Sequence, residues 1–251
     1  MARPLAETGI HFLDARGPDG LRLYAIGDVH GRLDLLRPMH ERIADEIARD
    51  RPDDWRIVHL GDYVDRGASS AGVIDFLIAA QAADPRVLAL GGNHDLGFLE
   101  FLGIPDPSGL FARYGGVDTA RSYGVHLDPG DSRAFARQAA ELGAAVPEAH
   151  RTFLRTLPLS LTSGDFFFCH AGIRPGVPLD RQEPRDLIWI RDAFLNYPGL
   201  HPKVVVHGHT PSPEAQVLAN RVNVDTGAYQ SNRLTALVVD GAAKRTMEVS
   251  V

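Results

Sequence analysis

The sequence predicts an α/β protein with a β-rich C-terminal half, and three observations support this fold class. The chain has 251 residues, 44% of them hydrophobic, which is enough to bury a large core. In the N-terminal part, short apolar runs alternate with segments of helical periodicity, the order that βαβ units produce. Later in the chain, apolar runs of strand length recur with few long helical patterns between them.

Three strands and two helices are expected in the N-terminal part. Short apolar runs predict strands within 21–31, over 55–61 and over 86–91. Apolar residues at three- and four-residue steps predict a helix over 33–47, and a second helix is expected over 71–83. Each apolar run ends in glycine and polar residues. Because ligands bind outside the carboxyl ends of strands in open α/β sheets, these polar residues should share one crevice.

Residues 97–160 follow a different pattern and are expected to form a mostly helical insertion. They contain glycines, prolines and two helical patches, over 132–142 and 149–157. Strand patterns then return at 165–170, 203–209, 221–225, 233–240 and in a last short run to Val251. In the first helix, the acidic residues Glu41, Asp45 and Glu46 are expected on a solvated face.

Composition excludes several classes of protein. The net charge of −6 argues against a nucleic-acid-binding face, which usually needs a basic surface. Cys169 is the only cysteine, so an internal disulfide cannot form and a reducing compartment fits. Residues 1–20 lack the apolar core of a signal peptide, and no stretch approaches the ~18 apolar residues of a membrane span. We expect a cytoplasmic protein without a membrane partner.

Five polar loop motifs carry the chemistry that the sequence predicts. Carboxylates, imidazoles and an amide oxygen form a ligand set that suits Mn, Fe, Zn or similar divalent ions. A single Gly-Asp pair would be read as a turn, but turns need no histidine or arginine at these offsets. An Asp-x-His pair places both side chains on one side of an extended segment, so one metal could bind both. The motifs are Gly27-Asp28-Val29-His30-Gly31, Gly61-Asp62-Tyr63-Val64-Asp65-Arg66-Gly67, Gly92-Asn93-His94-Asp95, His170-Ala171-Gly172 and Gly208-His209-Thr210.

This ordered set resembles the calcineurin-like metallophosphoesterases. The full GDYVDRG form resembles their phosphoprotein phosphatase branch, in particular its bacterial and phage-type serine/threonine phosphatases. The resemblance extends from about Leu21 to Val239. It implies one metallophosphoesterase domain over 1–251, folded as a four-layer α/β/β/α sandwich, with 97–160 as a helical cap.

The resemblance also implies a pair of divalent metal ions. Mn²⁺ is the first expectation, and Fe, Zn or Co are the alternatives, because the ligand set accepts all of them. A hydroxide shared by the ions would attack phosphorus in line. The implied ligands are Asp28 and His30 for the first ion, Asp62 as the bridge, and Asn93, His170 and His209 for the second.

Four further residues are expected to act on the substrate. His94 would protonate the leaving oxygen, and Asp65 would orient it and favour its charged form. Arg66 would clamp the phosphate with its planar fork. A second arginine is usual in the family; we assign Arg191, and Arg174 is the competing candidate.

Several other side chains have more ordinary expected roles. Tyr229 is expected to face the pocket, and His207 to support the metal ligands from behind. Trp189 is expected to anchor the segment that carries Arg191. His59 and Cys169, like Phe166, Phe167 and Phe168, are expected in the core.

Two substrate classes remain open. The GDxxDRG arginine favours a phosphomonoesterase that acts on phosphoserine or phosphothreonine, with dual specificity as an extension. The alternative is a hydrolase of small phosphorylated metabolites such as dinucleoside polyphosphates or nucleotides. Gly91 and Asp95 stand where eukaryotic protein phosphatases have arginine and glutamate, and 225–229 replaces their Tyr-Cys segment. A nuclease is disfavoured by the acidic balance, and a decayed enzyme by the presence of every expected group.

Overall fold

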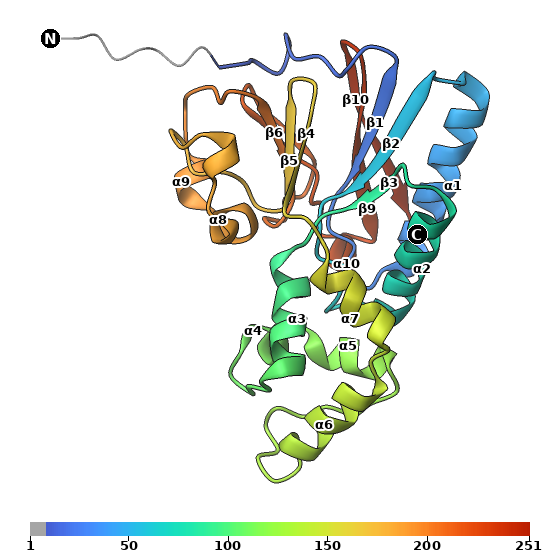
Figure 1. The fold of residues 1–251 in the computed structure, drawn as a ribbon, viewed down its shortest axis with the longest axis vertical. Helices are drawn as coiled ribbons and strands as arrows, with labels where there is room; N and C mark the ends of the chain where they lie inside the picture. Colours follow the sequence, from blue (N-terminus) through green and yellow to red (C-terminus); the bar gives the residue numbers. More distant parts are fainter. Residues whose placement is uncertain (1–8) are drawn as a thin grey trace, which may run out of the picture.

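Two five-stranded mixed sheets pack face to face in the computed structural model, which describes residues 9–251 (Figure 1). The first eight residues, part of the segment compared with signal peptides, lie outside the described residues. In the first sheet β1, β2 and β3 are parallel, and β9 is antiparallel to both β1 and β10. Its strands, in order across the sheet, are β10 (Ala243–Ser250), β9 (Arg233–Asp240), β1 (Leu21–Ile26), β2 (Asp54–His59) and β3 (Val87–Ala89).

The second sheet is also mixed and five-stranded, with shorter strands. Its three central strands are parallel, and an antiparallel strand lies at each edge. The order is β4 (Ser160–Ser163), β5 (Phe166–Cys169), β6 (Val204–His207), β8 (Arg221–Asn223) and β7 (Gln216–Val217). The carboxyl ends of the parallel strands in both sheets therefore deliver their loops to one edge of the sandwich.

The alternation of side chains along the strands builds a core on each side of the second sheet. Phe166 and Phe168 face the first sheet and pack with Val58. Phe167, between them, points outward with Val205. All three phenylalanines and Cys169 are buried, as expected, and burial raises the pKa of the Cys169 thiol.

Helices cover the outer face of each sheet. The helices α1 (Leu33–Asp50) and α2 (Ser70–Ala83) pack apolar side chains against the first sheet. The short helices α8 (Pro184–Trp189) and α9 (Asp192–Leu195) cover the second sheet (Figure 1). This confirms the expected α/β sandwich of helix, sheet, sheet and helix layers. The sequence did not predict α8 and α9, because four to six residues are too few to show helical periodicity.

Residues 97–160, the helical insertion, extend away from the sheets (Figure 1). Its first helix, α3, was not among the predicted helical patches and starts at Asn93, four residues before the expected start of the insertion. The strand β4 at its end was not predicted, because three of its four residues are polar. The helices are α3 (Asn93–Gly103), α4 (Leu110–Arg113), α5 (Gly116–Ser122), α6 (Phe135–Ala145) and α7 (Glu148–Arg155); a 3₁₀ turn, η1 (Leu179–Arg181), and α10 (Ala228–Ser231) follow later in the chain.

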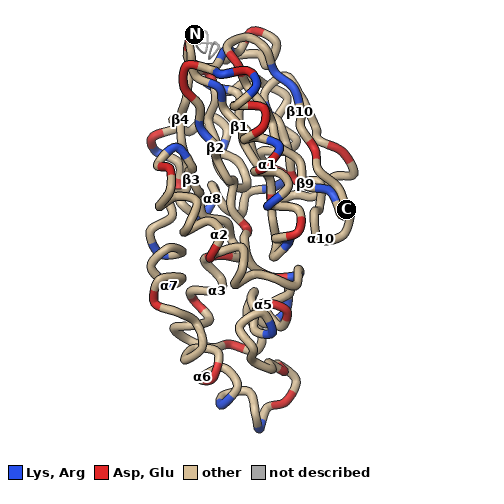
Figure 2. Tube along the Cα trace, turned by 90° about the vertical axis from the view of Figure 1, so that its right-hand side faces the viewer, with Lys and Arg blue, Asp and Glu red and all other residues tan. Residues whose placement is uncertain are grey.

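Charged residues of both signs are interleaved along the chain, as Figure 2 shows for one side. The expectation that Glu46 lies on a solvated face was wrong. Glu46 is buried, because it faces the first sheet and pairs with Arg22 at 3.3 Å and with Arg245. The Tyr24 hydroxyl also donates to it, at 3.0 Å. Within residues 9–251, each helix is too short or too polar to cross a bilayer.

Candidate metal centre and active site

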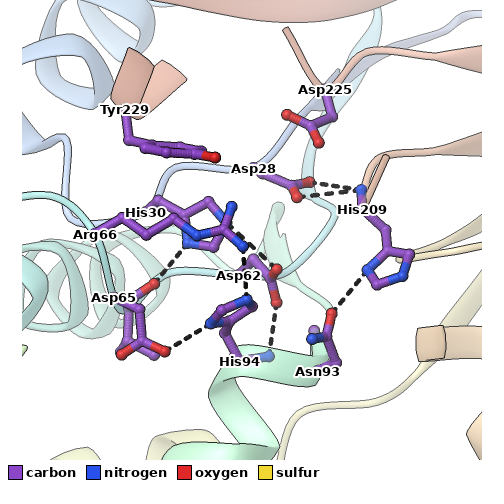
Figure 3. Close-up of polar contacts among 12 residues, drawn as sticks. Asp28, His30, Asp62, Asp65, Arg66, Asn93, His94, His209, Asp225 and Tyr229 are labelled. Atoms are coloured by element: carbon purple, nitrogen blue, oxygen red, sulfur yellow. Dashed lines mark hydrogen bonds and ion pairs between the residues drawn. The ribbon is translucent and has the colours of Figure 1, made fainter. Parts of the chain in front are cut away.

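The predicted site residues converge at the loop-bearing edge of the sandwich (Figure 3). The loops after β1, β2 and β3 contribute the Asp, His and Asn residues of the first three motifs, and the ends of β5 and β6 contribute the last two histidines. All six predicted metal ligands are buried: Asp28, His30, Asp62, Asn93, His170 and His209.

Two groups of donor atoms meet at Asp62. His30, Asp62 and His94 form one group, and Asp62, His170 and His209 form the other, with the donor atoms of each group within 4.8 Å of one another. The Asp62 Oδ2 atom lies 3.5 Å from His30 Nε2 and 3.4 Å from His170 Nε2. Asp62 is therefore the shared member, as a bridging ligand would be.

Asn93 and Asp28 complete the second side of the site. The Asn93 Oδ1 atom lies 2.9 Å from His170 Nε2 and 2.8 Å from His209 Nδ1. The Asp28 carboxylate accepts the backbone N–H of His209 at 3.1 Å, and one of its oxygens lies 3.9 Å from His170 Nδ1. Asp28 lies outside both three-residue groups, so its assignment to the first ion stays a prediction.

Several loops of the site have backbone with positive φ, a conformation that few residue types adopt readily. Seven non-glycine residues among 9–251 have positive φ, and five of them belong to this site. Each such residue costs about 1–3 kcal/mol unless its surroundings fix it. The five, with φ values of +44°, +55°, +72°, +70° and +66°, are His30, Asp62, Asp65, Arg66 and His209.

Asp95 fixes two of these loops together. Its buried carboxylate accepts the backbone N–H groups of Asp62 and Tyr63 at 2.8 Å each, and of Gly92 at 2.9 Å. The sequence singled out Asp95 only as a departure from the glutamate of eukaryotic phosphatases. Its role depends on three backbone donors from two segments, and the two donors of the Asp62 loop lie more than 30 residues away, which a linear motif does not reveal.

His94 and Asp65 form the expected pair. The Nδ1 atom of His94 lies 2.6 Å from Asp65 Oδ2, and both side chains are buried. Burial lowers the pKa of His94, but the charges of Asp62 and Asp65 outweigh it, so the pKa lies above its ordinary value. Arg66 reaches over the pair, with its Nη atoms 3.0 Å from His94 Nε2 and 3.0 Å from His30 Nε2.

The helical insertion supports this pair directly. The Thr119 hydroxyl in α5 donates to Asp65 Oδ1 at 2.8 Å and accepts the Asp65 backbone N–H at 2.8 Å. The backbone N–H of Arg66 donates to the Gly115 carbonyl at 3.2 Å. The sequence analysis did not find Thr119, because one threonine in a helical patch carries no recognisable signal.

The two competing arginines occupy different places. Arg191 donates from Nε to His209 Nε2 at 3.1 Å and lines the cavity over the site. Arg174 is half-exposed and paired with Asp186 at 2.7 Å. Tyr229 faces the site as expected, with its ring 4.5 Å from the Arg66 guanidinium (Figure 3).

Two histidines outside the ligand set are buried, as expected. His207 lies beside the carbonyl of Gly208, 3.0 Å from its Nδ1 atom, and so supports the loop that carries His209. His59 stacks on His40 in the layer between the first sheet and its helices.

The electrostatics of the site fit bound cations. Burial raises the pKa of Asp95 to about 7 and that of Asp225 to about 6, and burial together with the Asp225 charge raises the pKa of Asp28. The Oδ2 atom of Asp225 is buried without a hydrogen-bond partner in the described part of the chain. Divalent ions stabilise the charged form of crowded, buried carboxylates of this kind.

The pKa values of the histidines are also consistent with metal ligation. Burial lowers the pKa of His30 to about 3, and burial with the nearby His170 charge lowers the pKa of His209 to about 2. Both rings are therefore neutral, which is the form in which an imidazole binds a metal. Burial opposes the charge of His170, yet Asp62 and Asp28 raise its pKa to about 10, so metal binding there would displace a proton.

A cavity of about 490 Å³ opens over this centre. Its floor is polar and its mouth includes apolar side chains from the helical insertion and from α8. The lining residues are Asp62, Arg66, Asn93, His94, Leu110, Tyr114, Trp189, Arg191 and His209.

Comparison with known proteins gives the family. The model of the calcineurin-like phosphoesterase family matches residues 21–239. The chain belongs to the calcineurin-like phosphoesterases. This metallophosphoesterase assignment agrees with the converging His and Asp ligands. It does not distinguish the phosphoprotein phosphatase branch, which stays a prediction.

Curated relatives of this phosphoesterase share about a quarter of its sequence. The bis(5'-nucleosyl)-tetraphosphatase PrpE [asymmetrical] of Bacillus thuringiensis (strain Al Hakam) is 24% identical over 234 residues, covering 84% of this chain and 88% of the relative. The protein of the same name from Bacillus velezensis is 26% identical over 229 residues, covering 84% and 86%.

Solved structures share the fold. A crystal structure of a protein described as a diadenosine tetraphosphatase has a TM-score of 0.63 at 20% identity, covering 90% of this phosphoesterase and 93% of that chain. A Saccharomyces cerevisiae protein serine/threonine phosphatase has a TM-score of 0.56 at 14% identity, covering 93% and 81%. At these identities, the similarity concerns architecture alone.

Proposed function

We propose that this metallophosphoesterase hydrolyses a small phosphorylated metabolite of the dinucleoside polyphosphate class. The observation that carries the proposal is the cavity of about 490 Å³, which is lined by members of the ligand cluster, by Arg66 and Arg191, and by Leu110, Tyr114 and Trp189. A pocket of this size suits a small organic phosphate. The curated relatives, named as tetraphosphatases, support the same substrate class.

The roles of the residues follow from their positions. The two bound ions would supply an activated water and neutralise phosphate charge. Arg66 and Arg191 flank the floor of the cavity and would hold the phosphate oxygens by charge-assisted hydrogen bonds. His94, whose pKa is raised by the charges of Asp62 and Asp65, would give a proton from Nε2 to the leaving oxygen, and Asp65 would hold the ring through Nδ1.

The protein serine/threonine phosphatase predicted from the GDYVDRG motif is the second candidate. Its support is Arg66, which would clamp any terminal phosphate dianion. The same arginine would serve a nucleotide equally well, so the motif does not separate the two classes. The presence of Leu110 and Tyr114 from the insertion among the lining residues of the cavity favours the metabolite. Nucleic acid remains disfavoured as a substrate, on the net charge of −6.

Competition between substrates tests the proposal. With Mn²⁺ present, we expect kcat/KM for diadenosine tetraphosphate to exceed that for a phosphoserine peptide by at least about tenfold. The variant His94→Ala should lose both activities, and Arg174→Ala should keep both, because Arg174 is paired with Asp186 away from the cavity. A higher kcat/KM for the peptide would refute the metabolite assignment in favour of a protein phosphatase.

A further inference from the structure

Two aromatic side chains stand exposed at the mouth of the cavity. Among residues 9–251, seven large hydrophobic residues are exposed, and only Tyr114 and Trp189 are aromatic. Tyr114 is 53% exposed and Trp189 is 40% exposed, yet both line the same cavity. A tryptophan that only anchored its segment would be buried, so the expectation for Trp189 was incomplete.

The two rings come from different parts of the fold. Tyr114 follows α4 in the helical insertion, and its neighbour Gly115 accepts the backbone N–H of Arg66. Trp189 ends α8 outside the second sheet, with its ring centroid 5.9 Å from that of His209. Each aromatic ring is therefore linked to one of the two arginines: Tyr114 to Arg66, and Trp189 to Arg191 two residues further on.

The cavity thus separates two chemistries. The buried donor cluster forms its floor, and Arg66 and the exposed Arg191 line the cavity beside that cluster. Leu110 and the two exposed rings line its mouth. The charged groups suit phosphates, and the rings suit a flat apolar group. A nucleoside phosphate has the same division, because a charged phosphate chain is joined to a planar base. Bases stack on aromatic side chains whatever their identity, since every base has a π-face.

We propose that Tyr114 and Trp189 are nucleobase platforms that set the substrate preference of the site. The proposal rests on the proposed function and adds the residues that recognise the nucleoside part. The phosphate chain would lie over Arg66 and Arg191, and a base would stack at the mouth. A substrate with a base at each end could use both platforms.

Tryptophan fluorescence tests the platform at Trp189 without turnover. The chain has two tryptophans, and Trp55 lies under Arg86 in the first sheet, so Trp55→Phe leaves Trp189 as the only emitter. In that variant combined with His94→Ala, AMP should quench the emission saturably and bind about tenfold more tightly than ribose 5-phosphate, which lacks the base. Equal binding and equal quenching by the two ligands would overturn the proposal.

Kinetics test both platforms. Trp189→Ala and Tyr114→Ala should each raise KM for diadenosine tetraphosphate about tenfold, with a smaller change in kcat. The variants Trp189→Phe and Tyr114→Phe should keep KM near the parent value, because a phenyl ring still stacks. Ile104→Ala is the matched control, since Ile104 is exposed on the same insertion but lines a different cavity.

The outcomes separate this inference from the proposed function. If diadenosine tetraphosphate is hydrolysed but the alanine variants match the Ile104→Ala control, the platforms are wrong and the function stands. If a phosphopeptide is the better substrate while AMP still binds more tightly than ribose 5-phosphate, the function is wrong and the platforms stand.

Discussion

The hydroxyl of Thr119 offers a sharp test of how the helical insertion supports the chemistry. Thr119 is fully buried, and its hydroxyl is a donor to Asp65 Oδ1, which has no exposure to solvent. In Thr119→Val the shape is nearly kept while this donor is lost. The Asp65 backbone N–H still reaches Ser70 Oγ at 3.1 Å, but Asp65 Oδ1 loses its donor and Ser70 Oγ loses its 3.0 Å hydrogen bond to the Thr119 hydroxyl.

The size of the effect on stability and kcat follows mainly from the charged Asp65 oxygen that loses its donor. A hydrogen bond to a charged group contributes about 1.5–3 kcal/mol, so the free energy of unfolding should fall by about 2 kcal/mol. The other Asp65 oxygen holds His94 at 2.6 Å. If about 1.4 kcal/mol of the loss appears as misorientation of His94 in the transition state, kcat falls about tenfold. KM should change little, because Thr119 does not line the cavity.

The assay compares three variants by steady-state kinetics and urea unfolding. Thr119→Ser should restore both kcat and stability, because it returns the hydroxyl. Ser122→Ala is the matched control: Ser122 donates to the Thr119 carbonyl at 2.7 Å and accepts the N–H of Ala71 at 3.0 Å, without touching Asp65. It should lose stability and keep kcat. Equal kcat values in Thr119→Val and Ser122→Ala would refute the reasoning.

Three further predictions concern the metals, the phosphate clamp and pH. Exhaustive chelation should abolish phosphate release and added Mn²⁺ should restore it; full turnover by metal-free protein would exclude the dimetal centre. Arg66→Lys should lower kcat/KM by about 10–100-fold, because lysine lacks the fork that spans His30 and His94, whereas Arg174→Lys should have no effect. Burial lowers the pKa of His40 to about 4, so the unfolded chain, with a pKa near 6.5, binds the proton more readily. The contribution of His40 to stability should be full above about pH 6.5 and fall by about 2 kcal/mol towards pH 5, so His40→Asn should reduce the pH slope by about that amount in urea titrations; an unchanged slope would contradict this assignment.

The sequence was informative where motifs and strand ends coincide. The pattern of strands ending in Gly-Asp or Gly-Asn placed Asp62 and Asn93 at one edge of the sheets, and the structure brings them together. The apolar run of Phe166, Phe167 and Phe168 within the strand expected over 165–170 likewise predicted core residues, and all three are buried. These features are local, so a short window of sequence contains them.

The rest depends on contacts between distant segments. Asp95 and Thr119 act on backbone groups or carboxylates far from them in sequence, which no spacing reveals. Glu46 was misassigned for the same reason, because Arg22 and Arg245 reach it only across the folded sheet. The exposure of Trp189 could not be read from an apolar segment, since periodicity does not show which ring is left uncovered.

The helical insertion has an inner tier and an outer tier, with consequences for redesign. In the inner tier, Gly115 and Thr119 form hydrogen bonds with the loop that carries Asp65 and Arg66. In the outer tier, α6 lies at the far end from the sheets (Figure 1). Replacement of the whole insertion would therefore remove the hydrogen bonds that hold Asp65 and Arg66, which support the proposed proton donor His94, and the cavity residues Leu110 and Tyr114. Shortening the α6 tip should instead leave the metal and His94 site intact. Exchanging Leu110 and Tyr114 alone should change substrate selectivity while keeping that site.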